Sequence, residues 1–370
     1  MENGQKKIIL FMPSIDGGGV EKNLILISDY LAKHLDNIYL ITYDNKFNKF
    51  FNKKIKIINV TNSNLKESKY YKYFRCLLIL VFQFLRIYDC TVFSFQANVY
   101  CAILHKIFKF RLIVRSNSSP SGWSHGLVKK WIFRFFLKSV DNIVVNSDDF
   151  KNEFNKILKL KSKKIYNPLN KQEILIKSKE KIKFDFFNDK KALKIINVAR
   201  FTDQKDHMTL LESFNKISSK INCKLIIMGF GPNRKLIQNF LSKNKLGNKV
   251  KILNFQKNPY KYIKLSDLLI LTSRYEGLPN VLLEAMCLRV FIISSNCPTG
   301  PKEILNNGKY GYLFRVGDSK DLTKKIWDYK KLKNKQNIKK MINLGYKSLK
   351  RFNYEANCQK YLSLIQGRKK

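Results

Sequence analysis

Acidic residues are scarce in this sequence. Asp and Glu together number 27 against 71 Lys and Arg, which leaves a formal net charge of +44. The imbalance excludes an acidic, halophile-like protein and points to anionic partners: phosphates, nucleic acid or a membrane surface. An alternative is drift on solvated faces, because the chain is rich in Lys, Asn, Ile, Phe and Tyr together, the bias expected of an AT-rich genome. Charge alone therefore names no partner.

Closely spaced cysteines are also lacking. The seven cysteines are scattered, lie mostly in apolar stretches and include no C-x-x-C pair. This distribution argues against a disulfide framework and against a zinc site, and it suits a reducing compartment. We therefore expect a cytoplasmic location.

Long hydrophobic runs are missing too. The longest, Cys76–Leu85, is interrupted by Gln83, whereas a membrane-spanning helix needs about 20 apolar residues. Near the N-terminus, Ile8–Met12 is too short for a signal peptide and indicates a first buried strand. No membrane-spanning helix is predicted.

Two stretches of the chain repeat one pattern, in which short apolar runs alternate with helical spacing. Such runs, separated by helices, indicate parallel strands covered on both faces. We therefore predict an α/β protein with two Rossmann-like, doubly wound domains facing a central cleft, where ligands would bind. The predicted strands are Ile8–Met12, Ile38–Thr42, Ile55–Val60, Thr91–Phe95, Leu112–Arg115 and Asn142–Asn146 in the first stretch, and Lys194–Ala199, Lys224–Met228, Val250–Leu253, Leu268–Leu271, Val290–Ile293 and Gly311–Phe314 in the second.

The strongest chemical pattern follows the predicted strand at 268–271. It contains two acids, Glu276 and Glu284, with Gly277 permitting a tight loop and Pro279 suited to the first turn of the next helix. Backbone amides at a helix start can bind an anionic or hydroxyl-rich ligand. Glu284 falls in an apolar run, so its carboxylate needs a partner if it is buried. From spacing alone, a wet helix face or a core ion pair explains it equally well.

Glu276-x7-Glu284 resembles the E-x7-E pattern of GT-B glycosyltransferases, most closely the large retaining family 4. Other motifs resemble this family in the same order. They are Asn197–His207 with Arg200 and Lys205, the turn Met228–Pro232, the loop Asn254–Gln256, the turn and helix Cys297–Leu305, and Gly17–Glu21, which resembles the family's G-G-x-E loop.

The resemblance implies a retaining glycosyltransferase (glycosyl transferases group 1). It would move a hexose or N-acetylhexosamine from a UDP- or GDP-linked sugar to a glycan or lipid-linked acceptor, in cell-surface polysaccharide, lipopolysaccharide or lipid-linked oligosaccharide synthesis. Arg200 and Lys205 would hold the diphosphate and Glu276 would lie beside it, which makes these three the expected catalytic residues. No cofactor and no essential metal are implied. The expected substrate-binding residues are Gly17, Gly18, Gly19, Asn117, Gly229, Phe255, Gln256, Gly277, Leu278, Pro279, Asn280 and Glu284.

The resemblance also implies an arrangement of domains. An acceptor-binding domain would span 1–168 and be completed by a C-terminal helix at 351–370. A linker at 169–190, with a hinge and a short connecting helix, would lead to a nucleotide-sugar-binding domain at 191–350.

The first half departs from the family at one place. Many members have a His after the fifth strand, where this sequence has Asn117. Asn can hydrogen-bond a sugar hydroxyl but cannot act as a base near neutral pH. Arg115 is a further candidate to face the cleft, and Trp123 suits either a sugar-stacking wall or the core.

Two segments of the first half, Tyr70–Arg75 and Lys129–Lys138, interleave bases with aromatics. Such helices bind anionic membrane surfaces, which would make the enzyme peripheral on the inner face of the plasma membrane. The alternative is an amphipathic helix with its aromatics packed inward. Other functions remain open: another GT-B enzyme, such as a nucleotide-sugar epimerase or a phosphorylase, or a basic nucleic-acid-binding protein. For the last we find no recognition motif, so nucleic acid is not an expected partner.

Overall fold

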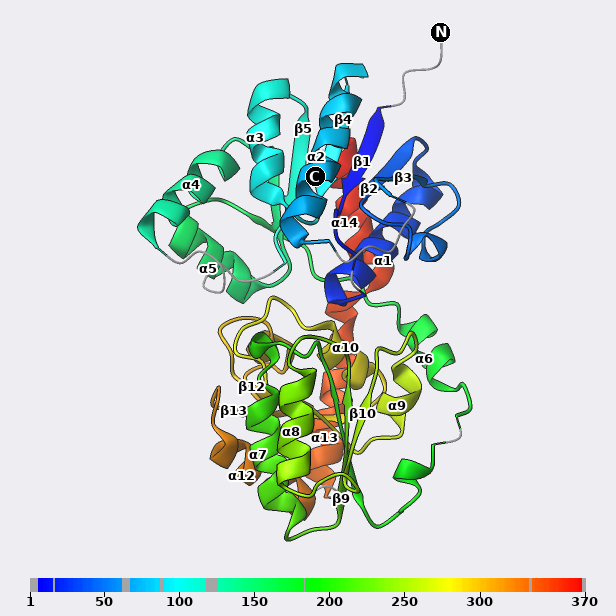
Figure 1. Cartoon of the computed structure of the whole chain (residues 1–370), viewed down its shortest axis with the longest axis vertical. Coiled ribbons are helices and arrows are strands. Elements are labelled where there is room, and N and C mark those ends of the chain that lie inside the picture. Colours follow the sequence, from blue (N-terminus) through cyan, green and yellow to red (C-terminus); the bar gives the residue numbers. More distant parts are fainter. Residues whose placement is uncertain are drawn as a thin grey trace. The chain divides into compact units, whose positions relative to one another are not determined.

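The chain divides into two compact units in the computed structural model (Figure 1). Unit 1 comprises Met1–Pro168 and Tyr354–Lys370, and unit 2 comprises Leu169–Asn353. The structure describes residues 6–15, 17–61, 67–86, 89–117, 126–182, 184–332 and 335–367.

Unit 1 contains a parallel sheet in the order β3-β2-β1-β4-β5-β6-β7. The strand order reverses between β1 and β4, so the carboxyl ends of these two strands form the switch point where such sheets bind ligands. The strands are β1 (Lys7–Phe11), β2 (Ile38–Thr42), β3 (Lys56–Asn59), β4 (Cys90–Ser94), β5 (Arg111–Arg115), β6 (Asn142–Val145) and β7 (Lys163–Lys164). The helices are α1 (Gly19–His34), η1 (Asn48–Phe50), α2 (Lys69–Arg86), α3 (Asn98–Phe108), α4 (Leu127–Leu137), α5 (Asp148–Leu158) and α14 (Tyr354–Gln366).

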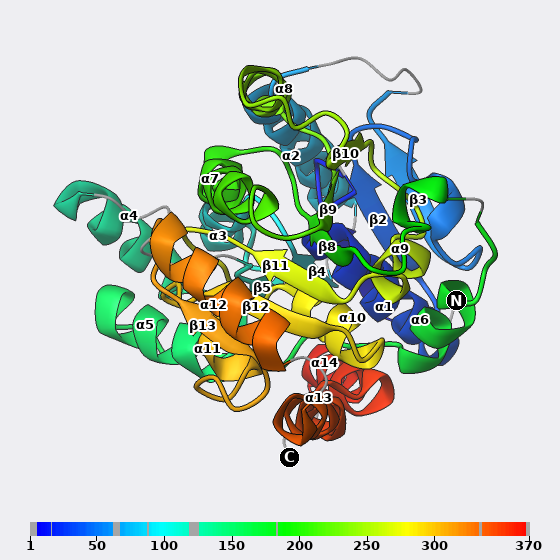
Figure 2. The ribbon, with the colours of Figure 1, turned by 90° about the horizontal axis from the view of Figure 1, so that it is seen from below.

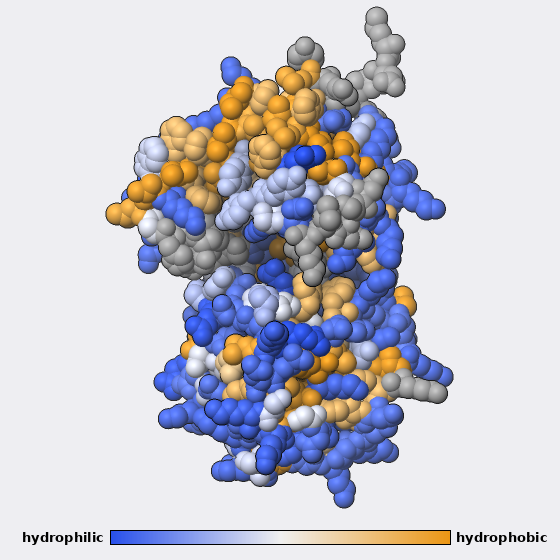
Figure 3. Space-filling model, viewed as in Figure 1, coloured by the Kyte–Doolittle hydropathy of each residue, from blue (hydrophilic) through white to orange (hydrophobic). Residues whose placement is uncertain are grey.

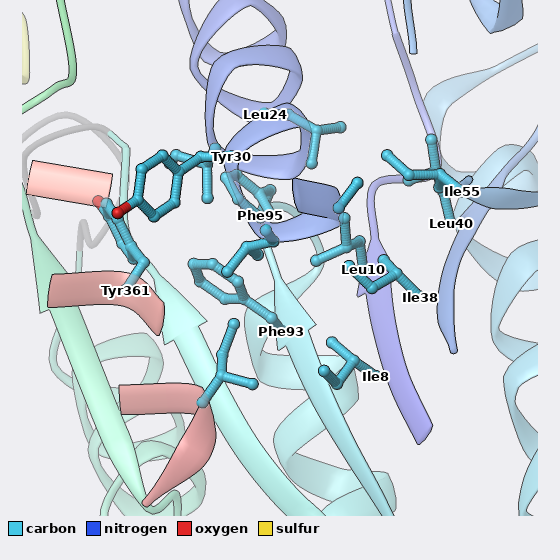
Figure 4. Packing of buried hydrophobic residues seen from close by; sticks show 14 of the residues in the cluster. Ile8, Leu10, Leu24, Tyr30, Ile38, Leu40, Ile55, Phe93, Phe95 and Tyr361 are labelled. Atoms are coloured by element: carbon cyan, nitrogen blue, oxygen red, sulfur yellow. The ribbon is translucent and has the colours of Figure 1, made fainter. Parts of the chain in front are cut away.

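Both faces of this sheet are buried. Along β1, Ile8 and Leu10 belong to one hydrophobic cluster, and Ile9 and Phe11 belong to another on the opposite face. Alternate side chains of a strand point to opposite faces, so a strand buried on both sides must be apolar throughout. Figure 4 shows the first cluster, in which Tyr361 of α14 packs beside Phe93 of β4.

Unit 2 contains a second parallel sheet, in the order β10-β9-β8-β11-β12-β13, with its switch point between β8 and β11. Figure 2 shows α7 on one side of this sheet and α10 on the other. The strands are β8 (Leu193–Val198), β9 (Cys223–Met228), β10 (Val250–Leu253), β11 (Leu268–Leu271), β12 (Phe291–Ser295) and β13 (Tyr312–Phe314). The helices are α6 (Lys171–Ser178), η3 (Asp185–Phe187), η4 (Asp203–Lys205), α7 (His207–Ser218), α8 (Arg234–Lys243), α9 (Tyr260–Lys264), α10 (Asn280–Cys287), α11 (Pro301–Ile304), α12 (Ser319–Leu332), α13 (Gln336–Ser348) and η5 (Leu349–Phe352).

The prediction of two Rossmann-like α/β sheets with parallel strands is confirmed. The segment 169–190, which the sequence suggested as a linker, instead packs within unit 2. Its helix α6 buries Ile174, and the side chain of Asn258, just before α9, donates to the backbone oxygen of Lys177 at 2.8 Å. The segment is therefore an integral part of that unit.

Candidate active site

The first predicted site residue, Arg200, lies two positions after the end of β8. Its side chain is exposed. The turn that contains it is bonded to the turn after the neighbouring strand β9, since the amide of Phe201 donates to the oxygen of Phe230 at 2.7 Å. Gly229 makes this close approach possible. A Cβ there would lie 1.9 Å from the backbone oxygen of Ala199, so no other residue fits without moving the turn.

Lys205 and Glu276 form an ion pair at the carboxyl edge of this sheet. The Lys205 Nζ lies 2.5 Å from Glu276 Oε1, and the two side chains are only 15% and 8% exposed. The same carboxylate oxygen accepts a hydrogen bond from the Ser273 hydroxyl at 2.6 Å. Two strands of one sheet therefore bring together residues 71 positions apart.

Hydrogen bonds between the two loops hold this pair independently of its charges. The Arg274 amide donates to the backbone oxygen of Gln204, whose side chain donates in turn to the oxygen of Tyr275, both at 2.8 Å. The Thr272 hydroxyl donates to the oxygen of Lys205 at 2.8 Å. These bonds preorganise both loops, so that substitution of one charged residue need not displace the other.

The loop after Glu276 leads into α10. Gly277, Leu278 and Pro279 are buried, and the Thr299 hydroxyl donates to the backbone oxygen of Glu276 at 2.5 Å. The sequence suggested that Pro279 lies in the first turn of α10. It instead immediately precedes the helix, because its ψ of 108° is extended and not helical. Asn280 is the first residue of α10 and is half-buried.

Glu284 lies inside α10 and is 6% exposed. Its neighbours in sequence, Leu283 and Ala285, are fully buried. The structure thus excludes the wet helix face that spacing alone allowed. A carboxylate in such surroundings is costly unless it is paired, and Glu284 does have a polar or electrostatic partner.

Phe255 and Gln256 follow β10 in an exposed loop. Phe255 packs edge-on against Phe230, with 6.1 Å between ring centroids, and both rings remain exposed. The Gln256 side chain donates only a long bond, 3.3 Å, to the oxygen of Asn254. β10 pairs with β9, and Gly229 comes directly after β9. This loop and Gly229 therefore follow two neighbouring strands.

Two groups of predicted residues lie in unit 1. Gly17 and Gly18 precede α1, which begins at Gly19. In the first turn of that helix, Glu21 is buried, and a Cβ on Gly18 would lie 2.8 Å from its Oε2. Our prediction included the three glycines among the site residues and left out this acid, although the G-G-x-E pattern contains it.

Asn117, the other predicted residue of unit 1, uses both polar atoms of its side chain within that unit. Its amide nitrogen donates to the backbone oxygen of Phe95 at 2.7 Å, and its oxygen accepts from Arg115. Arg115 itself is fully buried and also donates to Tyr361 and Asn167, at 3.0 and 2.6 Å, so the expectation that it faces a cleft is wrong. Trp123 lies outside the described residues.

Among the described residues, no group of three or more His, Cys, Asp or Glu has an arrangement that could hold a metal ion. No helix in this part of the chain is long and apolar enough to cross a membrane.

Comparison with known proteins matches this architecture to a family. The model for glycosyl transferases group 1 matches residues 178–348. An uncharacterized glycosyltransferase of Methanocaldococcus jannaschii is 32% identical over 305 residues, which make up 72% of this chain and 75% of that protein. The chain belongs to the glycosyl transferases group 1 family. It is therefore a glycosyltransferase, as the resemblance implied.

This group 1 glycosyltransferase is also 26% identical over 237 residues to the Campylobacter jejuni N-acetylgalactosamine-N,N'-diacetylbacillosaminyl-diphospho-undecaprenol 4-alpha-N-acetylgalactosaminyltransferase, covering 60% of this chain and 62% of that enzyme. Its fold matches the crystal structure of Anabaena HepE in complex with UDP-glucose, with a TM-score of 0.78 and 17% identity over 98% of this chain and 99% of that one. The GT-B fold expected from the motifs is thereby confirmed.

Proposed function

We propose that this glycosyltransferase transfers a hexose or N-acetylhexosamine, with retention at the anomeric carbon, from a UDP- or GDP-linked sugar to a glycan acceptor. The observation that carries this proposal is the nearly buried Lys205–Glu276 pair before α10, at the carboxyl edge of the unit 2 sheet. A structural neighbour was solved with UDP-glucose, and a relative is named for transfer onto a diphospho-undecaprenol-linked glycan. Both names support a nucleotide-sugar donor and a lipid-linked acceptor.

In this proposal Arg200 and Lys205 bind the diphosphate of the donor. Each charge-assisted hydrogen bond contributes about 1.5–3 kcal/mol. Negative charge accumulates on the diphosphate as the sugar departs, so both cations stabilise the transition state more than the ground state. Of these two cations, Arg200 is exposed and Lys205 is nearly buried.

Glu276 has two roles in this proposal. Without donor it neutralises Lys205, which would otherwise be a nearly buried cation without its counter-charge. When the diphosphate arrives, Lys205 shifts its hydrogen bonding toward it, and Glu276, still held by Ser273, lies beside the transferred sugar. The carboxylate thus holds the lysine side chain in place.

Other predicted residues bind the rest of the donor in this proposal. Glu284 accepts hydrogen bonds from the ribose hydroxyls, and the backbone around Phe255 and Gln256 contacts the base. The amides at the start of α10, from Leu278 to Asn280, bind oxygens of the donor. Gly17–Gly19 and Asn117 of unit 1 are proposed as further substrate-binding residues. The proposal includes no cofactor and no essential metal, and it places the enzyme in the cytoplasm, in cell-surface or lipid-linked glycan synthesis.

A thermal-shift panel of nucleotide sugars tests the proposal first, because a donor that binds the folded state raises the melting temperature by mass action. The stabilising donor is then incubated with lipid-linked glycan acceptors, and release of nucleoside diphosphate is measured together with the anomeric configuration of the product. Failure of every UDP- and GDP-sugar to stabilise the protein would contradict the donor assignment. An inverted product would contradict retention.

A further inference from the structure

Helix α2 has two apolar faces. Its inner face packs Cys76, Leu80 and Phe84 into the core of unit 1. Its outer face repeats large apolar side chains every three or four residues, and all of them are exposed. A helix that is apolar all round is normally covered on every side. The exposed residues of α2 are Tyr70, Tyr71, Phe74, Leu78, Phe82 and Leu85.

Helix α4 repeats this arrangement. Phe133, Phe136 and Leu137 face the core. Leu127, Val128, Trp131 and Phe135 point outward, and Trp131 is 64% exposed. The alternative, in which the aromatics of this segment pack inward, is therefore wrong for Trp131 and Phe135, which are exposed.

Helix α3 joins these two surfaces into one. Tyr100 of α3 lies edge-on to Tyr73 of α2, with ring centroids 6.3 Å apart. On its other side, the Lys106 ammonium lies 3.5 Å from the centroid of the Phe135 ring of α4, which stacks on Trp131. Figure 3 shows apolar residues gathered over these three helices. We call this surface of unit 1 the α2–α4 face.

The three helices of this face contain cations and no acid. Between Ser68 and Val140 the sequence has a single acid, Asp89, which lies before β4 and not on any of the three helices. The same helices and their ends carry exposed cations among the apolar side chains. These are Lys69, Arg75, Lys106, Lys129, Arg134 and Lys138.

We infer that the α2–α4 face docks on an anionic lipid bilayer. Its exposed Trp, Tyr and Phe side chains suit the boundary between headgroups and acyl chains, while the surrounding Lys and Arg meet anionic headgroups. A second copy of this face would bring cations against cations. Nucleic acid would leave the aliphatic members, such as Leu78 and Leu127, without a phosphate or base to contact. The inference does not rest on the proposed reaction.

Co-sedimentation with vesicles tests this surface directly. The full chain is mixed with phosphatidylcholine vesicles that contain about 30% phosphatidylglycerol, or with phosphatidylcholine alone, at low and high salt. We expect the chain to bind the anionic vesicles at least about ten-fold more tightly than vesicles of phosphatidylcholine alone. Binding to the anionic vesicles should weaken as the salt concentration rises. A wild-type chain that stays in the supernatant with anionic vesicles at low salt would overturn the inference.

Paired variants separate this face from the general positive charge. Trp131→Ser with Phe135→Ser, and separately Lys129→Glu with Arg134→Glu, should each weaken vesicle binding about ten-fold or more. The matched control is Lys339→Glu with Lys340→Glu on α13 of unit 2, which makes the same charge change on exposed side chains and should leave binding within about two-fold. Equal losses in both charge variants would contradict the inference, as would a dimer in sedimentation velocity that the α4 variants dissociate. These vesicles contain no sugar acceptor, so the result does not depend on whether transfer occurs.

Discussion

Lys205 Nζ and Glu276 Oε1 lie 2.5 Å apart in unit 2, although the two residues belong to loops after different strands. The ion pair is nearly buried, and backbone hydrogen bonds between the loops hold both of its members in place.

Lys205→Ala and Glu276→Gln should each lower kcat/KM at least ten-fold, about 1.4 kcal/mol or more. The double variant should lose less than the product of the two single losses, because the two side chains act as one unit. Steady-state kinetics with the stabilising donor measure this. Lys177→Ala provides the control, since it breaks a partly exposed ion pair with Glu173 on α6 and should leave activity within about two-fold. Strictly multiplicative losses would show that the pair is not coupled in catalysis.

Glu284→Ala should also lower kcat/KM at least ten-fold, about 1.4 kcal/mol or more. If the carboxylate binds the ribose, the thermal stabilisation by nucleoside diphosphate should shrink in parallel. Glu355→Ala changes an exposed acid on α14 and should affect neither measurement. A variant with undiminished nucleotide binding and wild-type turnover would remove Glu284 from the site.

EDTA should leave the rate of sugar transfer unchanged, because the diphosphate charge is expected to be met by Arg200 and Lys205. The assay compares initial rates after exhaustive dialysis against chelator with rates after Mg²⁺ or Mn²⁺ is restored. Complete loss of activity, with recovery on metal addition, would show that a divalent cation takes part.

Gly300→Ala should destabilise unit 2 by about 2 kcal/mol or more. Gly300 has a φ of +89°, and a Cβ there would lie 2.4 Å from the backbone oxygen of Gly277 in the loop that leads into α10. Denaturant unfolding measures the change, and donor binding should weaken with it. At Gly247 no atom lies within 4 Å of an added Cβ and φ is not in the left-handed region, so Gly247→Ala should cost much less.

The stability of the protein should fall in acid partly because of His207. Burial, and to a lesser extent the nearby charge of Lys205, lower the pKa of its imidazole from 6.5 to about 4. Neither ring nitrogen has a hydrogen-bond partner among the described residues. As pH falls, His207 therefore becomes protonated near pH 6.5 in the unfolded chain, but only near pH 4 in the folded chain. This contribution to stability is complete above pH 6.5 and falls as pH drops toward 4, by about 3 kcal/mol in total.

His207→Leu removes this titration. Its free energy of unfolding, measured with denaturant between pH 7.5 and 4, should decline less steeply than that of the wild type. Parallel curves for the two proteins would show that His207 does not titrate in this range.

The sheets of both units were predictable because their strands are apolar runs between helices. The bounds of β2, β10 and β11 agree with the predicted ones residue for residue. The strand β7 was not predictable in the same way, since it consists of Lys163 and Lys164 at a sheet edge and offers no apolar run. Helix α13 was also hard to predict, because only two of its residues, Ile338 and Gly345, are buried.

The charged residues of the candidate site could be predicted from motifs with a characteristic spacing. The hydrogen bonds that support these residues could not. Ser273 and Thr299 hold Glu276 through single hydroxyls, and hydroxyl residues at such spacing occur in any sequence. Arg115 was misplaced for a related reason. Its partner Tyr361 is 246 residues away, and only the folded chain shows that this guanidinium is satisfied inside unit 1.

The return of α14 to unit 1 affects how this protein must be made. The chain leaves unit 1 at Pro168 and re-enters it at Tyr354, so ribosomes complete unit 2 before they deliver Tyr361 to Arg115. Until then the ring of Phe93 lacks its contact with Tyr361, and Arg115 lacks the Tyr361 hydroxyl that accepts its hydrogen bond. Translation that stops short of Tyr354 would therefore release a chain whose later-made half is intact and whose earlier-made half is an open target for chaperones and proteases.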